Sequence, residues 1–264
     1  MEHTILFFIF GLLIGSFLNV VICRMAEGET LMGRSVCRSC RKQIAWYDNI
    51  PVFSYLVLGG RCRQCEERIS WQYPTVELLT GILYGLVGMF FFSPTPFGIL
   101  EALWLLVLVS LFISIAFYDL RNMEIPVTLL FLGIAVALIY LSATFFLFER
   151  AWPFWTTALG TGLMGAAIVG GFFFLLVFLS HEKWMGWGDV WLGVLAGLAV
   201  GWQLAFFLLT LSFALGAAVG IGLLALRKKS MQAQLPFAPF LVSGTLVTLF
   251  LERTASWLTR FFLW

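Results

Sequence analysis

Charged residues are scarce in this sequence. Asp, Glu, Lys and Arg make up 11% of its 264 residues, and hydrophobic residues make up 61%. Soluble domains average about 25% charged and about 45–50% apolar residues, so the composition excludes an ordinary soluble fold. The net charge of +2 is also too small to indicate a nucleic-acid partner. We therefore predict no nucleic-acid binding.

A basic N-terminal segment is missing as well. Glu2, His3 and Thr4 precede the first apolar run, and no small-residue cleavage site closes that run, so we expect no cleaved signal peptide. Long hydrophobic runs, by contrast, are abundant. Four uncharged runs exceed the roughly 18 residues that mark a membrane-spanning candidate. They cover residues 4–23, 126–148, 151–180 and 190–226.

The last of these runs is too long for one crossing. As a single helix its 37 residues would reach about 55 Å, against a hydrocarbon core of about 30 Å. We expect it to turn back near Gly201-Trp202-Gln203, which leaves a short sixth span over residues 190–201. Shorter apolar stretches add three further spans. One covers 74–92, one ends at 118, and one covers 237–251. The sequence thus predicts an all-α integral membrane protein with about eight transmembrane helices.

The only long polar segment runs from Arg24 to Tyr73. With this segment on the cytoplasmic side, 13 of the 16 basic residues face inward, as the positive-inside rule requires, and both termini face outward. Three divisions follow: a first transmembrane helix over residues 1–23, a cytoplasmic loop over 24–73, and a seven-helix membrane domain over 74–264.

Four cysteines in the polar segment form two C-x2-C pairs, Cys37 with Cys40 and Cys62 with Cys65. Each pair places two sulfurs around one turn, and two pairs complete a tetrahedral metal site. Two disulfides are the alternative, but a cytoplasmic loop lies in a reducing compartment. We predict structural Zn²⁺, with an iron centre as the alternative metal, because four sulfurs leave no open position for water.

Two aspartates stand at the cytoplasmic ends of predicted spans. Asp119 ends the third, and Asp189 opens the sixth within Gly186-Trp187-Gly188-Asp189. Taken singly, each is explained as a helix cap. Taken together, at one depth and beside glycines that let a substrate backbone approach, they fit an acid–base pair that activates water. We predict Asp119 and Asp189 as catalytic residues and Gly186 and Gly188 as active-site backbone.

The order of motifs resembles the type IV prepilin peptidases, the G-x-G-D leader peptidases that also act as N-methyltransferases. The first helix reads Gly15-Ser16-Phe17-Leu18-Asn19, and the polar segment carries Asn49-Ile50-Pro51 between the cysteine pairs. Tyr73-Pro74-x2-Glu77 opens the second span. Further matches are Ile125-Pro126 after Asp119, the G-x-G-D motif, and Leu235-Pro236-Phe237-Ala238-Pro239-Phe240.

This resemblance implies a bifunctional enzyme of the bacterial inner membrane. Such enzymes cut the short basic leader from type IV prepilins or type II secretion pseudopilins on the cytoplasmic side. They then methylate the new N-terminus, usually phenylalanine, with S-adenosyl-L-methionine. The catalytic pair carries over to Asp119 and Asp189, and the metal ligands to the four cysteines. The expected partners are leader peptides and the lipid bilayer.

Some residues depart from the family pattern or stay ambiguous. Many members have a lysine where this chain has Trp191, and an aspartate where it has Val127. Glu77 is interpreted as a helix-dipole anion or a partner of loop arginines, although a role in binding the new amine is open. Two other functions remain: a presenilin- or signal-peptide-peptidase-like protease, and a multispan transporter with a zinc-sensing loop.

Overall fold

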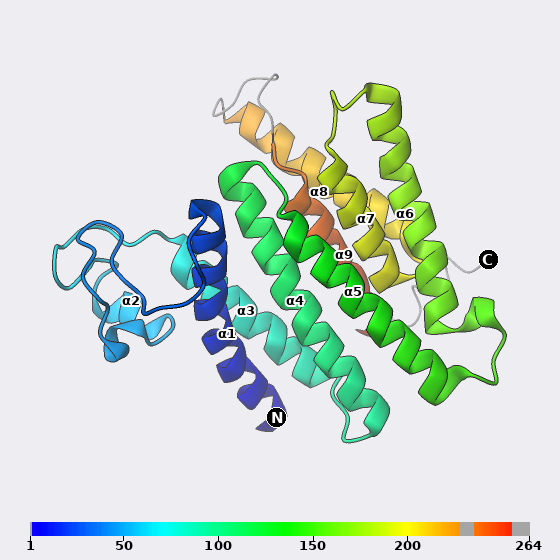
Figure 1. The fold of residues 1–264 in the computed structure, drawn as a ribbon, viewed down its shortest axis with the longest axis horizontal. Coiled ribbons are helices and arrows are strands. Elements are labelled where there is room, and N and C mark those ends of the chain that lie inside the picture. The colour runs from blue at the N-terminus through cyan, green and yellow to red at the C-terminus, as the bar shows by residue number, and fades with distance from the viewer. Residues whose placement is uncertain (1, 227–234, 255–264) are drawn as a thin grey trace. The chain divides into compact units, whose positions relative to one another are not determined.

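The computed structural model describes residues 2–226 and 235–254, and it is helical, with no strand in these ranges. Two isolated β-bridges, Val36 with Gln43 and Arg61 with Arg68, lie in the polar segment. The helices are α1 (Glu2–Glu27), α2 (Phe53–Val57), α3 (Gln72–Phe90), α4 (Pro96–Asn122), α5 (Val127–Thr144), α6 (Ala158–Ser180), α7 (Trp187–Val200), α8 (Ala205–Ala225) and α9 (Ala238–Thr254) (Figure 1).

Six of these helices are long and apolar enough to cross a membrane: α1, α3, α4, α5 with its π-helical continuation to Glu149, α6 and α8. The predicted all-α membrane fold is therefore confirmed. Helix α7 has 14 residues, or about 21 Å of helix, which is shorter than the hydrocarbon core. The count of eight crossings stays a prediction.

Several helix bounds differ from the expected ones. Helix α4 continues to Asn122, so that Asp119 lies in its last turn rather than after it. Helix α7 begins at Trp187, which makes Asp189 its third residue. The fifth span begins at Ala158 instead of 151, because a 3-10 turn over Phe154–Thr156 comes first and Thr157 caps the helix. These shifts leave both aspartates inside helix ends.

The predicted reversal after α7 is present. Helix α7 ends at Val200, Gly201 adopts a φ of +78°, and α8 begins at Ala205. A left-handed φ suits glycine, which has no Cβ to collide with the backbone. The basic Arg227-Lys228-Lys229 stretch, which follows the uncharged run over 190–226 in the sequence, lies outside the described residues.

The chain divides into two compact units. One comprises the chain up to Pro94 together with Glu101–Ser114, and the other comprises Thr95–Leu100 and the chain from Ile115 onward. In the first, α1 and α3 pack closely through glycines. A Cβ at Gly15 would lie 2.6 Å from the Glu77 Cα, and one at Gly11 would lie 2.8 Å from the Gly81 Cα. Small residues let membrane helices approach at backbone distance.

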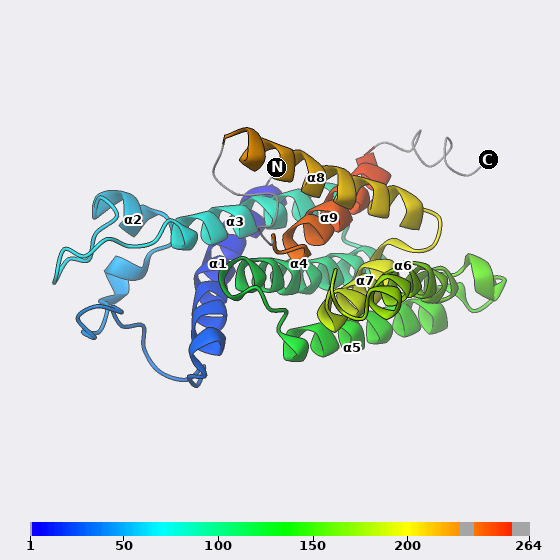
Figure 2. The same cartoon turned by 90° about the horizontal axis from the view of Figure 1, so that it is seen from above.

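In the second unit, glycines likewise let α6 and α7 pack closely. A Cβ at Gly197 would lie 2.7 Å from the Ala166 Cα, and one at Gly193 would lie 2.6 Å from the Phe173 ring. Phe173 is itself fully buried. Figure 2 shows α6 and α7 side by side, and α8 beside α9. This packing positions α7, whose first turn carries Asp189.

Candidate active site and metal site

Asp119 occupies a defined position at the end of α4. Its side chain is buried, with 4% of its surface exposed. The backbone N–H of Ala238, the first residue of α9, donates to Asp119 Oδ2 over 3.2 Å. The Asp119 backbone carbonyl accepts from Met123, whose left-handed conformation ends α4. The carboxylate is therefore oriented by a helix N-terminus that comes 119 residues later in the chain.

Asp189 is held by its own helix. The Gly186 backbone N–H donates to Asp189 Oδ2 over 3.2 Å and closes a capping arrangement around the first turn of α7. The side chain is half-buried. The negative charge of Asp119 also acts on the Asp189 carboxyl group. The structure thus brings together the two residues that the sequence singled out.

This arrangement suits acid–base chemistry on a peptide bond. Two carboxylates that interact at close range do not both ionise readily, so one retains a proton while the other stays anionic. The anion can remove a proton from water, and the acid can donate one to a leaving amine. Each carboxyl group here has one oxygen bonded to a backbone N–H and a second oxygen without such a bond. The orientation of both groups therefore comes from the backbone.

The two glycines of the G-x-G-D motif have different surroundings. A Cβ at Gly188 would lie 2.9 Å from the Ile125 Cβ, so the Ile125-Pro126 segment leaves no room for a side chain there. A Cβ at Gly186 would meet nothing within 4 Å, and its backbone is extended, with a φ of −94°. Gly188 is needed for packing, whereas Gly186 leaves open space beside Asp189.

We expect Gly188→Ser to destabilise the protein by about 1–3 kcal/mol, the usual range for overpacking. Gly186→Ser adds the same side chain at an N-cap, where serine is favoured, and should change stability by less than about 0.5 kcal/mol. Thermal unfolding of both variants in one detergent provides the comparison. Equal stability of the two would contradict the close packing of Gly188 on Ile125.

The four cysteines of the polar segment converge on one point. The sulfur atoms of Cys37, Cys40, Cys62 and Cys65 all lie within 4.8 Å of one another, and Cys37 Sγ is 3.8 Å from Cys65 Sγ. All four are free thiols. A disulfide would need about 2.05 Å between sulfurs. Four sulfurs about 2.3 Å from a common zinc stand about 3.8 Å apart, so the cluster can hold a tetrahedral metal ion.

The two C-x2-C pairs have the same backbone structure. In each pair the backbone N–H of the first cysteine donates to the carbonyl five residues later: Cys37 donates to Lys42 and Cys62 to Glu67, both over 2.9 Å. The residue after each second cysteine is left-handed, with φ of 59° at Arg41 and 58° at Glu66. One isolated β-bridge closes each turn. The metal site is thus built from two copies of one knuckle.

The cluster is electrostatically suited to a cation. The Glu67 backbone hydrogen bond lowers the pKa of the Cys65 thiol, but desolvation and hydrogen bonds with Cys62, Cys40 and Cys37 outweigh it and raise this pKa to about 12. Thiols packed together in this way resist ionisation on their own, and a divalent cation favours the thiolate form. Zinc bound here would cross-link the two knuckles and would have no open position for catalysis.

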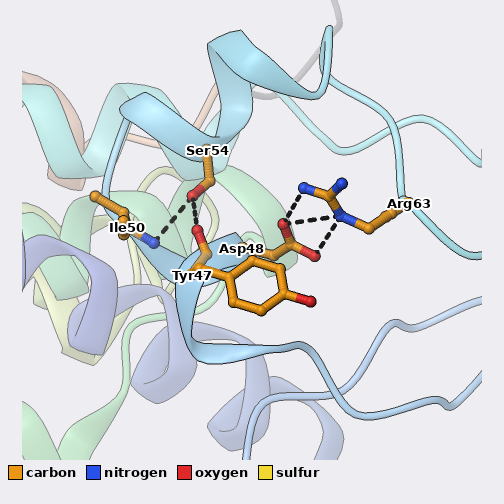
Figure 3. A network of polar contacts seen from close by, with 5 residues as sticks. All are labelled: Tyr47, Asp48, Ile50, Ser54 and Arg63. Carbon is orange, nitrogen blue, oxygen red and sulfur yellow. Dashed lines mark hydrogen bonds and ion pairs between the residues drawn. The ribbon is translucent and has the colours of Figure 1, made fainter.

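A network that the sequence analysis missed connects the second knuckle to the turn between the cysteine pairs (Figure 3). Arg63, inside Cys62-x2-Cys65, donates from Nε and Nη2 to both oxygens of Asp48, with a shortest distance of 2.7 Å. The Asp48 carboxylate raises the pKa of Arg63 through this bond. Ser54 accepts from the Ile50 N–H and donates to the Tyr47 carbonyl. The available signal was a charged residue, Arg63, inside a C-x2-C knuckle, with an opposite charge, Asp48, between the cysteine pairs.

Glu77 has a different environment from the expected one. It lies in the second turn of α3, and its Oε2 accepts from the Val52 backbone N–H over 2.7 Å instead of pairing with a loop arginine. Ser16 of α1 also bonds to this carboxylate. Asn19 Nδ2 donates to the Tyr73 carbonyl over 3.0 Å and so joins α1 to α3.

The two departures from the expected motif lie around α5. Trp191 of α7 packs against Phe131 of α5, with ring centroids 5.1 Å apart. Val127 is the first residue of α5, and it is exposed. Both positions therefore carry apolar side chains on the elements that flank Asp189.

Comparisons with known proteins match most of the chain to one family. Residues 9–91 match the model of the bacterial peptidase A24 N-terminal domain, and residues 106–221 match the model of the type IV leader peptidase family. The second match contains Asp119 and Asp189, and the first contains the four cysteines. No solved structure gives a significant match.

Curated relatives agree with these matches. A prepilin leader peptidase/N-methyltransferase of Aeromonas salmonicida is 33% identical over 96% of this chain and 92% of its own length. The proteins of the same name from Bacillus subtilis and Pseudomonas aeruginosa are each 32% identical, over 91% and 88% of this chain. With this identity over nearly the full length, and with both domain models in order, the chain belongs to the prepilin leader peptidase/N-methyltransferase family.

Proposed function

We propose that this protein is a membrane aspartic endopeptidase that cuts the leader from type IV prepilins or pseudopilins and then N-methylates the new N-terminus. The observation that carries the proposal is the placement of two aspartates at helix ends, Asp119 in the last turn of α4 and Asp189 in the first turn of α7. The names of the relatives support both activities. They favour this function over a presenilin-like protease or a transporter.

In the peptidase reaction, one aspartate of the pair acts as a base and the other as an acid. The anionic carboxylate takes a proton from water as its oxygen attacks the scissile carbonyl carbon. The protonated carboxyl group then donates its proton to the leaving nitrogen, and the C–N bond breaks. The N–H groups of Ala238 and Gly186 hold the two carboxyl groups in place throughout. The open space at Gly186 gives an extended leader room to approach Asp189.

The second activity requires a methyl donor, which we assign as S-adenosyl-L-methionine. It supplies an electrophilic methyl group to the amine that cleavage exposes. Zn²⁺ is assigned to Cys37, Cys40, Cys62 and Cys65, where it stabilises the loop between α1 and α3. We keep the division of the chain proposed from the sequence, with a first helix over 1–23, a zinc loop over 24–73 and a catalytic membrane domain over 74–264.

The protein is a multi-pass membrane protein, and we place it in the bacterial inner membrane with its loop and dyad on the cytoplasmic side. The distribution of basic residues supports this orientation. A prepilin begins with a charged leader followed by an apolar helix, so its scissile bond lies at the membrane surface. The ends of α4 and α7 would then stand at the depth of that bond.

Mass spectrometry of a pilin co-expressed with this protein tests the proposal directly. We expect a pilin N-terminus that lacks the leader and carries one added methyl group. An uncleaved pilin would contradict the peptidase activity. A cleaved but unmethylated pilin would contradict the second activity alone.

The orientation predicts which positions a membrane-impermeant thiol reagent reaches. A cysteine introduced at Glu182, beyond the end of α6, should react only after the inner membrane is opened. A cysteine at Arg150, which follows the π-helical end of α5, should react in cells whose inner membrane is intact. The native cysteines are replaced in the parent protein, so that only the introduced cysteine can react with the reagent. The reverse labelling pattern would place the dyad on the wrong side for a cytoplasmic leader.

A further inference from the structure

The first unit contains a buried carboxylate that the peptidase reaction does not use. Glu77 is 7% exposed, and it lies within an apolar helix. Asp119 and Asp189 both belong to the second unit. No Lys or Arg side chain of the described residues forms an ion pair with Glu77. A carboxylate buried in a membrane helix is costly, and one without a countercharge is a candidate functional group.

A hydrogen-bond acceptor without a partner lies among the polar groups between α1 and α3. Ser16 and Asn19 lie one turn apart on α1, facing Tyr73 and Glu77, one turn apart on α3. Asn19 is 1% exposed, and its Nδ2 donates to the carbonyl oxygens of Gly15 and Tyr73. Its Oδ1 is buried with no hydrogen-bond partner. An unsatisfied buried acceptor calls for an explanation, and one explanation is a donor brought by a ligand.

The backbone of the loop segment that contacts Glu77 is strained. Val52 has a φ of 60° and a ψ of −48°, which is rare for a β-branched residue. Its N–H is the one that Glu77 binds. The turn is further fixed by Ser54, and by Asp48 through its ion pair with Arg63 of the second knuckle. Such strain persists only where surrounding contacts impose it, and it is concentrated at functional sites.

A ligand that fits this cluster must bring N–H donors and positive charge. A primary ammonium group has three donors and one charge, and it can face the Glu77 carboxylate and Asn19 Oδ1 together. The proposed leader cleavage creates one such group, the α-ammonium of the mature pilin. We propose that Glu77 binds this amine and accepts its proton in the methylation reaction, an inference that rests on the proposed methyltransferase activity.

The proposed methylation reaction begins with a proton transfer. The substrate ammonium gives one proton to the Glu77 carboxylate and becomes a neutral amine with a free electron pair. That pair forms a bond to the methyl carbon of the sulfonium donor, the carbon–sulfur bond breaks, and its electrons leave with the sulfur as a thioether. The product is a secondary ammonium, and the proton on Glu77 returns to water.

Peptide binding tests the assignment without any methyl donor. Two peptides with the mature pilin N-terminal sequence, one with a free phenylalanine amine and one N-acetylated, are titrated into the full-length protein in detergent. For Glu77→Gln we expect the free-amine peptide to bind at least about tenfold more weakly, because the charge is lost. Binding of the acetylated peptide should not change. Glu29→Gln, which neutralises an exposed loop carboxylate, is the matched control and should bind both peptides like the wild type.

The pH dependence of methylation separates a base from a structural residue. Near pH 7 we expect Glu77→Gln to lower the methylation rate by about 10²–10⁴-fold, the usual contribution of a general base. An α-amine has a pKa of about 7.7–8.0, so near pH 9.5 it is already neutral in water and the defect should shrink at least about tenfold. Leader cleavage should continue at the wild-type rate at both pH values.

Three results would overturn the assignment of Glu77. They are wild-type methylation by Glu77→Gln, an equal loss of binding for both peptides, and a methylation defect that does not respond to pH. Gln keeps the shape of Glu and can still accept the Val52 N–H, so the variant retains that contact. If the wild type itself does not methylate a pilin, the proposed methyltransferase function fails instead, and the peptide titration still reports on the amine site.

Discussion

Asp119→Asn and Asp189→Asn should each lower leader cleavage by about 10²–10⁴-fold, the usual contribution of a positioned acid or base. Asparagine keeps the size of aspartate, but it can neither hold the exchanging proton nor activate water. Its amide oxygen can still accept from Ala238 N–H at position 119 or from Gly186 N–H at position 189, so both variants should remain folded. A purified-enzyme assay on a prepilin measures the effect.

The double variant provides a second test of the pair. Because the two carboxyl groups act as one unit, Asp119→Asn combined with Asp189→Asn should be little worse than either single change. Glu124→Gln removes an exposed carboxylate five residues beyond Asp119 and should cleave like the wild type. Normal cleavage by either single aspartate variant would refute the dyad.

The second large effect concerns the metal site. Changing any of Cys37, Cys40, Cys62 or Cys65 to Ser should lower the zinc content of the purified protein from about one ion per chain to a small fraction of that. Structural zinc contributes about 10–16 kcal/mol of binding free energy in small finger peptides, and this loop has few other buried side chains. We therefore expect the loop to become sensitive to protease, with cleavage within residues 24–71.

Cys23→Ser is the matched control for these variants. Cys23 is buried in α1, where its sulfur lies 3.7 Å from the Tyr73 hydroxyl, and it is not part of the cluster. The zinc content of the Cys23→Ser variant should equal that of the wild type. The membrane helices should persist in all five variants, because their backbone hydrogen bonds are internal. Retention of a full zinc ion by Cys37→Ser or Cys65→Ser would contradict the four-sulfur site.

Local patterns were enough to predict the helices and the metal knuckles. An apolar run of about 20 residues has few alternatives to a membrane helix, and a 37-residue run has to turn. Two C-x2-C pairs likewise carry their geometry in their spacing. Helix ends were less accurate, because the extra turns of α4 and α7 depend on caps at Met123 and Gly186 that composition does not reveal.

Contacts between distant segments were harder to predict. The hydrogen bond from Ala238 to Asp119 joins residues 119 positions apart, and the one from Val52 to Glu77 joins a loop to a membrane helix. Both donors are backbone N–H groups, which every residue except proline has, so the sequence carries no signal for them. The interpretation of Glu77 as a partner of loop arginines was wrong for this reason.

The sequence by itself determined that this is a helical membrane protein with a four-cysteine loop and two aspartates at helix ends, because hydrophobic length, ligand spacing and scarce charge are local properties. Only the tertiary structure decided which groups surround those residues. It placed Asp119 under the N-terminus of α9, Ile125 against Gly188, Arg63 on Asp48, and Glu77 beneath the strained Val52. These contacts depend on helices brought together by glycine packing, and packing is set by the fold as a whole.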